Sequence, residues 1–170
     1  VFGCIISHIK SRNLKKLKKR IIISAVNVVE AGPLVVLKEC LEHLSVNLSN
    51  EYRIIALVNN TKLFDSKNIK YLEFPRSKRS WLNRLYYEYG YFHKIAGQFK
   101  PFLWVSLHDM TPRVKAERLA VYCHNASPFY KLSWQEALTD PKFALFNLFY
   151  KYLYAINIKR NAFVIVQQDW

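Results

Sequence analysis

The sequence is poor in glycine, and it has no fingerprint loop for a nucleotide cofactor. Only 4 of its 170 residues are glycine. Neither the G-x-G-x-x-G pattern of dinucleotide-binding loops nor the G-x-x-x-x-G-K-S/T pattern of P-loops occurs. The sequence therefore gives no support to a dehydrogenase or a nucleotide hydrolase built on either loop.

Cysteine is also scarce. The three cysteines, Cys4, Cys40 and Cys123, are odd in number, widely spaced and without a C-x-x-C pair. This pattern predicts neither a disulfide framework nor a zinc site, and it favours a reducing compartment. No other set of side chains has the spacing of metal ligands, so no metal is expected.

The chain has no long hydrophobic run near its start. Residues 1–9 are apolar but too few to span a bilayer, and the basic run follows this segment, whereas in a signal peptide it would precede it. The sequence therefore predicts no secretion signal, and the expected location is the cytoplasm.

Acidic residues are few: the sequence has 12 of them and 26 basic residues, for a net charge of +14. Seven basic residues lie between Lys10 and Arg20, and no acid occurs before Glu30, so half of the net charge lies in this stretch. We interpret residues 1–19 as a basic leader before a domain spanning 20–170. The charge favours an anionic partner, which could be nucleic acid, anionic lipid or a phosphorylated substrate.

Six short apolar runs predict β-strands, at residues 21–26, 53–58, 70–74, 102–107, 119–123 and 164–166. Helical patterns separate several of them. Pro33 suits the first turn of a helix whose leucines share one face, and Ser80 suits the N-cap of a helix that ends before Pro101. Ser133 and Glu136 have capping-box spacing, and Asp140 with Pro141 predicts the start of a helix that runs to about residue 158.

This alternation predicts the α/β class, with a Rossmann-like, mostly parallel sheet and helices on both faces. In such sheets ligands bind outside the carboxyl ends of the strands. The residues that the sequence places there are Gly32, His108, Asp109, His124 and Asn125.

Each of these residues has a functional and a structural interpretation. Gly32 would let a phosphate or sugar approach the backbone at a helix N-terminus, or it is an ordinary turn residue. His124 would bond a sugar hydroxyl or a phosphate oxygen, or it is a capped loop histidine. Asp109 would accept hydrogen bonds from an acceptor sugar, or it serves a turn.

Two aromatic segments also allow two interpretations. Basic residues at 76–79 followed by aromatic residues at 81–91 suit nucleic-acid binding, but the helical spacing favours core residues beside a solvated basic loop. The aromatic residues of segment 143–158 suit a membrane-facing surface, but an internal helix packed on the sheet is favoured. These are Phe143, Phe146, Phe149, Tyr150, Tyr152, Tyr154 and Ile158.

Four segments resemble the N-terminal domain of family 4 glycosyltransferases, which have the two-lobed GT-B fold. They are AGPLVVLKECLEHL, LHDMTPR, VYCHNASPFY and FVIVQQDW, and the resemblance spans roughly residues 20–170. Ala31, Gly32 and Pro33 match the loop near the donor diphosphate, with one glycine where many relatives have two. His124 falls where the family often has an active-site histidine, and this implies contact with the transferred sugar or its phosphate.

The resemblance implies a retaining transferase that uses a nucleotide-sugar donor as co-substrate, without a metal or other cofactor. This lobe would present a glycan or lipid-linked glycan acceptor, with contacts from His108, Asp109 and Asn125. The donor-binding C-terminal domain, with its pair of glutamates, would lie beyond Trp170, so the fragment alone is expected to be inactive. Location at the inner face of the membrane, against anionic lipid, is also implied.

Two other functions remain open at the level of the sequence. The first is a non-catalytic basic α/β domain that binds nucleic acid, which ranks below the transferase. The second is a flavodoxin-like or sugar-responsive regulatory domain, which would share the fold.

Overall fold

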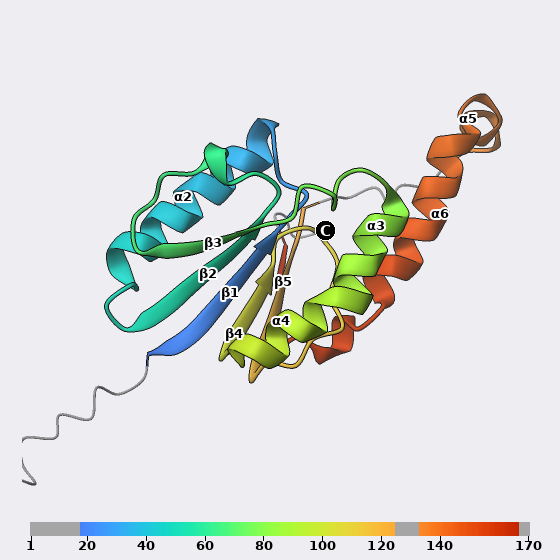
Figure 1. Ribbon diagram of the computed structural model, residues 1–170. Coiled ribbons are helices and arrows are strands. Elements are labelled where there is room, and N and C mark those ends of the chain that lie inside the picture. The colour runs from blue at the N-terminus through green and yellow to red at the C-terminus, as the bar shows by residue number, and fades with distance from the viewer. Residues whose placement is uncertain (1–17, 125–132, 167–170) are drawn as a thin grey trace, which may run out of the picture.

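A single sheet of six parallel strands forms the centre of the computed structural model, which describes residues 18–124 and 133–166 (Figure 1). The strand order is β3-β2-β1-β4-β5-β6, the order of a Rossmann fold, and all five strand pairs are parallel. All six predicted strands are therefore confirmed. They are β1 (Lys19–Ala25), β2 (Tyr52–Val58), β3 (Ile69–Glu73), β4 (Leu103–Ser106), β5 (Arg118–Cys123) and β6 (Phe163–Val166).

The central strands are apolar on both faces because helices cover both faces of the sheet. One face packs on α2 (Ala31–Asn47), which buries Leu37 and Leu41 against β1 and β2. The other face packs on η2 (Tyr86–Tyr91) and α4 (Phe92–Phe99), which follow α3 (Trp81–Leu85), around Phe92 and Trp104. The predicted Rossmann-like α/β fold is thus confirmed, including helices on both faces (Figure 1).

The helix predicted after Ser80 is interrupted in its middle. Ser80 caps α3 as predicted, because its hydroxyl accepts a hydrogen bond from the Asn83 amide at 3.2 Å. Residues of η2 then form a π-helical turn before α4 begins. Such turns are rare and are frequent at functional sites. Glu88, in this turn, is fully buried.

After β5 the chain forms α5 (Trp134–Thr139) and α6 (Pro141–Ala155), and α6 lies beside α3 (Figure 1). The side chain of Asp140 accepts a hydrogen bond from the Phe143 amide at 2.9 Å, so the predicted cap of α6 is confirmed. The helix ends at Ala155, before the predicted end near 158, where the short helix η4 (Ile158–Arg160) follows. Another short helix, η1 (Thr61–Leu63), precedes β3.

Some predictions fall outside the described residues. Residues 1–17 of the basic leader are among them, and β1 begins at Lys19, one residue before the predicted domain boundary. The side chain of Glu136 in the predicted capping box is another. Within residues 18–124 and 133–166, no helix is both long and apolar enough to cross a membrane.

Candidate functional site

The carboxyl ends of β1, β4 and β5 meet at one edge of the sheet, where the strand order changes direction. In Rossmann folds this switch point is the usual ligand site. A polar pocket of about 190 Å³ opens there. It is lined by Asn27, Val28, Val29, Glu30, Pro33, Lys78, Arg84, His108, Asp109, His124 and Tyr150.

An apolar pocket of about 320 Å³ adjoins the polar one. It is lined by residues of α2 and of the ends of β4 and β5, among them Gly32, Leu107 and Tyr122. The two pockets share Val28, Pro33 and His124. The loop before α2 and the imidazole after β5, far apart in sequence, thus lie on the same rim of the sheet.

His124 is held by Asp109, which follows β4. One carboxylate oxygen of Asp109 accepts a hydrogen bond from the His124 amide at 2.7 Å and lies 3.2 Å from the His124 Nδ1. The other oxygen is 3.4 Å from the hydroxyl of Tyr150 on α6. Asp109 has a positive φ of 67°, a conformation that Asp tolerates better than most residues. The strand ends and α6 together therefore fix the imidazole.

The burial of Asp109 bears on its predicted role. Only 2% of this residue is exposed, and both carboxylate oxygens have partners within the protein. A side chain so enclosed is suited to orient His124, and contact with an acceptor sugar would require these bonds to be exchanged. The sugar contact stays a prediction for Asp109, while the structure favours a positioning role.

The pair also shifts the pKa values of both partners. Burial opposes ionisation of Asp109 and is the largest single influence, but hydrogen bonds and charge from His124, with a hydrogen bond from Tyr154, outweigh it and lower the pKa. The hydrogen bond to Asp109 raises the pKa of His124, against the opposing effects of burial and of the Arg84 charge. A lowered pKa of the carboxyl group and a raised pKa of the imidazole are the shifts expected when a carboxylate is paired with an imidazolium.

The pair gives the stability of the domain a pH dependence. His124, whose pKa is raised above 6.5, stabilises fully below pH 6.5, and this stabilisation is lost as pH rises through the raised value. Asp109, whose pKa is lowered below 3.8, stabilises above pH 3.8, and this is lost as pH falls through the lowered value. We expect the difference in unfolding free energy between wild type and Asp109→Asn to be largest between these limits and to shrink above pH 6.5. Urea denaturation at a series of pH values measures this difference, and a difference that stays constant from acid to alkaline pH would contradict the pairing.

His108 lines the polar pocket, but its ring is engaged in the interior. Its Nε2 is hydrogen-bonded to a carboxylate oxygen of Glu88, and both residues are buried. Its backbone carbonyl accepts a hydrogen bond from the Arg84 guanidinium at 2.7 Å. These contacts anchor the loop that carries Asp109, and the predicted sugar contact of His108 stays a prediction. Asn125 lies outside the described residues.

The loop predicted to contact the donor diphosphate opens α2. Ala31 has a positive φ of 57°, whereas no described glycine does, so the strained position is the alanine. No atom lies within 4 Å of the place where a β-carbon would stand on Gly32, so the space beside it is open. Glu30, the N-cap residue, makes no side-chain cap. Its carboxylate accepts a hydrogen bond from Lys78 at 2.6 Å instead, and this contact lowers the pKa of Glu30.

The sequence did not single out Arg84 or Tyr150 as site residues, and it assigned Lys78 to a solvated loop. Arg84 also lies over the ring of Trp81, 4.9 Å from its centroid. The only feature of the sequence that could have pointed to Arg84 is its helical spacing from the aromatic residues around it. Its place in the pocket depends on tertiary packing between α3 and the end of β4.

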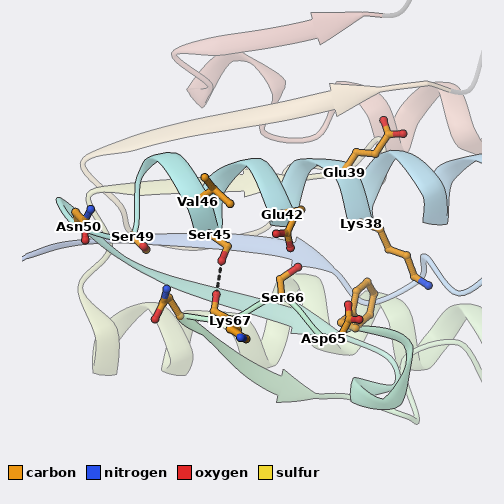
Figure 2. Close-up of a pocket in the computed structure, with 12 residues that line it drawn as sticks. Lys38, Glu39, Glu42, Ser45, Val46, Ser49, Asn50, Asp65, Ser66 and Lys67 are labelled. Atoms are coloured by element: carbon orange, nitrogen blue, oxygen red, sulfur yellow. Dashed lines mark hydrogen bonds between the residues drawn. The ribbon is translucent and has the colours of Figure 1, made fainter.

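A larger hollow lies elsewhere in the described part of the chain. A groove of about 810 Å³ lies between α2 and the loop before β3. A hydrogen bond from the Ser45 hydroxyl to the Lys67 carbonyl bridges it (Figure 2). Acidic side chains (Glu39, Glu42 and Asp65) and basic ones (Lys38 and Lys67) line it together. It shares no lining residue with the pockets at the strand ends. Its mixed charge selects no particular ligand.

Among residues 18–124 and 133–166, no group of three or more histidine, cysteine, aspartate or glutamate side chains is placed to hold a metal ion. Cys40 and Cys123 are free thiols. Burial, with the charge of Asp109, raises the pKa of Cys123 to about 11, so the nucleophilic thiolate is scarce at neutral pH.

No protein-family model and no curated protein sequence matches this chain.

Proposed function

We propose that this chain is the acceptor-side lobe of a retaining GT-B glycosyltransferase that uses a nucleotide-sugar donor. The observation that carries the proposal is the common pocket: the loop at Gly32 and the imidazole of His124 face one cavity at the switch point of a Rossmann sheet. The segments that resemble family 4 glycosyltransferases include both of these features. A second lobe would close the site from above the sheet edge.

The charges around the polar pocket suit the phosphates of such a donor. The N-terminus of α2 carries partial positive charge, and its first amides are not capped by Glu30. Lys78 and Arg84 bring two further cations to the pocket wall, where the carboxylates of Glu30 and Asp109 also lie, paired with Lys78 and His124. The raised pKa of His124 favours its protonated form, which adds a third positive group.

The orientation of His124 assigns its nitrogens different tasks. Nδ1 faces the Asp109 carboxylate at 3.2 Å, which leaves Nε2 for a ligand. From there, Nε2–H would donate a hydrogen bond to a hydroxyl of the transferred sugar or to a phosphate oxygen. Charge that develops on the departing diphosphate would be stabilised by this bond.

The nucleic-acid alternative has less support from the aromatic segment. Tyr87 and Tyr91 pack against the core cluster around Phe74, as the helical spacing favoured. Trp81 packs on Phe146 and Tyr150 of α6. Trp81 keeps 43% of its surface exposed despite this packing, and Tyr86 is largely exposed. A base-stacking platform needs several free rings in a row, and these two rings, five positions apart, do not provide it.

Ligand-observed NMR on the 170-residue chain tests the proposal. Saturation transfer to UDP-glucose, GDP-mannose and UDP-N-acetylglucosamine should show weak binding of at least one donor, with the diphosphate-proximal protons closest to the protein. The signal should be lost in His124→Ala and kept in His43→Ala, which changes an exposed histidine of α2. If no donor showed saturation transfer and an RNA oligonucleotide bound in a salt-sensitive way, the nucleic-acid-binding alternative would be favoured.

A further inference from the structure

The helix α6 is apolar on both of its faces, although only one of them is packed on the fold. Its inner face is buried at Asn147, Tyr150 and Tyr154. Its outer face exposes Leu145, Leu148, Phe149, Tyr152 and, just after the helix, Ile156, at 61%, 56%, 67%, 66% and 42% of their surface. The spacing of these five residues, three, four, seven and eleven positions after the first, places them on one stripe of the helix. The sequence favoured an internal helix, and the structure shows that one apolar stripe of the helix is exposed.

The short helix α5 continues this apolar exposure. Trp134 and Leu138 are 87% and 80% exposed, the highest values among the exposed large hydrophobic residues of the described chain. Figure 1 shows α5 and the start of α6 projecting beyond the rest of the fold, on the side of α3 that faces away from the sheet. We call the seven residues together the outer apolar surface. They are Trp134, Leu138, Leu145, Leu148, Phe149, Tyr152 and Ile156.

A surface of this composition suggests an occupant, because exposed apolar patches mark interaction sites. The charge of the chain decides whether the occupant is a second copy of the protein or an anionic surface. From Trp134 to Val166 the sequence has four basic residues, Lys142, Lys151, Lys159 and Arg160, against two acidic ones, Glu136 and Asp140, so this segment is net positive. The whole chain carries +14, so a second copy of it would be repelled, whereas an anionic surface would be attracted.

We propose that the outer apolar surface of α5 and α6 docks on an anionic bilayer. Tryptophan and tyrosine favour the level of the lipid headgroups, and leucine and phenylalanine favour the acyl region below. Lysine and arginine beside them meet the negative lipid charge. This is the composition of a helix that lies in the membrane interface.

Docking there would place the candidate site close to the membrane. The inner face of the same helix presents Tyr150 to the polar pocket, where its hydroxyl faces Asp109. The pocket and the bilayer would then be separated by one helix, roughly 10–12 Å across. The docking does not depend on the proposed function, because it requires only the surface and the lipid.

Vesicle co-sedimentation of the 170-residue chain, without any sugar donor, tests the docking. We expect binding to vesicles of phosphatidylcholine with phosphatidylglycerol, little binding to phosphatidylcholine alone, and weaker binding at high salt. Leu145→Gln with Phe149→Gln should lower the partition coefficient roughly tenfold or more, since each side chain loses its burial in the acyl region. Lys142→Gln and Lys159→Gln should each lower it roughly fivefold.

The matched control is Val35→Gln with Val46→Gln, which changes two exposed apolar residues of α2 and should leave binding unchanged. All substituted residues are exposed, and thermal unfolding followed by circular dichroism confirms that the variants fold. Binding that is unchanged in the Leu145 and Phe149 variant would overturn the proposal, and would assign adsorption to the basic residues before β1. Self-association in sedimentation equilibrium that this variant abolishes, without vesicle binding by the wild type, would assign the surface to a second copy instead.

Discussion

Replacing Glu88 by alanine should lower the free energy of unfolding by about 3–5 kcal/mol, because the substitution removes one member of a buried, hydrogen-bonded pair. Glu88 is fully buried in the π-helical turn, and only 3% of its partner His108 is exposed. Without the carboxylate, the imidazole would lose its Nε2 hydrogen bond in a place that water does not reach. Urea denaturation at neutral pH, followed by circular dichroism, measures the loss.

Two controls separate this pair from a general effect of removing an acid. Glu39→Ala, on the exposed side of α2, should change the unfolding free energy by no more than about 0.5 kcal/mol. Glu88→Leu with His108→Leu should recover much of the stability, since a buried polar pair can be replaced by apolar groups of similar size. A loss below about 1 kcal/mol in Glu88→Ala would show that the pair is not held as the structure has it.

The fold was predictable because its central strands are covered on both faces. Ile21–Ala25 and Ile54–Val58 are buried without interruption, so they appear in the sequence as almost continuous apolar runs, interrupted only by Ser24. The helix caps at Ser80 and Asp140 were equally predictable from the sequence, because capping is a local interaction between residues three positions apart.

The interruption of the helix after Ser80 was not predictable from periodicity. A π-helical turn adds one residue to a turn, and the aromatic positions on either side still fit helical spacing approximately. Glu88 lies among tyrosines and resembles a solvated acid in the sequence. Its partner His108 is 20 positions away, so its burial depends on how α3 and η2 meet the end of β4.

The candidate site was predicted in position but not in the roles of all its residues. The rule that ligands gather at the carboxyl ends of parallel strands located Gly32, His108, Asp109 and His124. It could not distinguish a side chain that faces the pocket from one that faces the protein. That distinction depends on Tyr150, which α6 brings to Asp109 from 41 positions away.

Replacing His124 by alanine, in an enzyme that carries both lobes of the proposed fold, should lower the turnover number by about 10²–10³-fold. The expected cause is loss of the Nε2–H that would meet the sugar or its phosphate, since this bond strengthens as charge develops on the leaving diphosphate. The alanine variant also removes the partner of a buried carboxylate, so part of its effect would come from Asp109. Steady-state kinetics at saturating donor must therefore be read beside the free energy of unfolding.

The variants His124→Asn and His124→Gln separate the two contributions. The asparagine amide can occupy the place of Nδ1 and keep the bond to Asp109, so stability should be largely kept while turnover falls as in the alanine variant. The glutamine amide reaches the place of Nε2, so it should retain more turnover than asparagine despite its weaker hold on Asp109. If His124→Asn were as active as the wild type at unchanged stability, the distal nitrogen would have no part in the reaction. The pairing of His124 with Asp109 would then serve only to join the ends of β4 and β5.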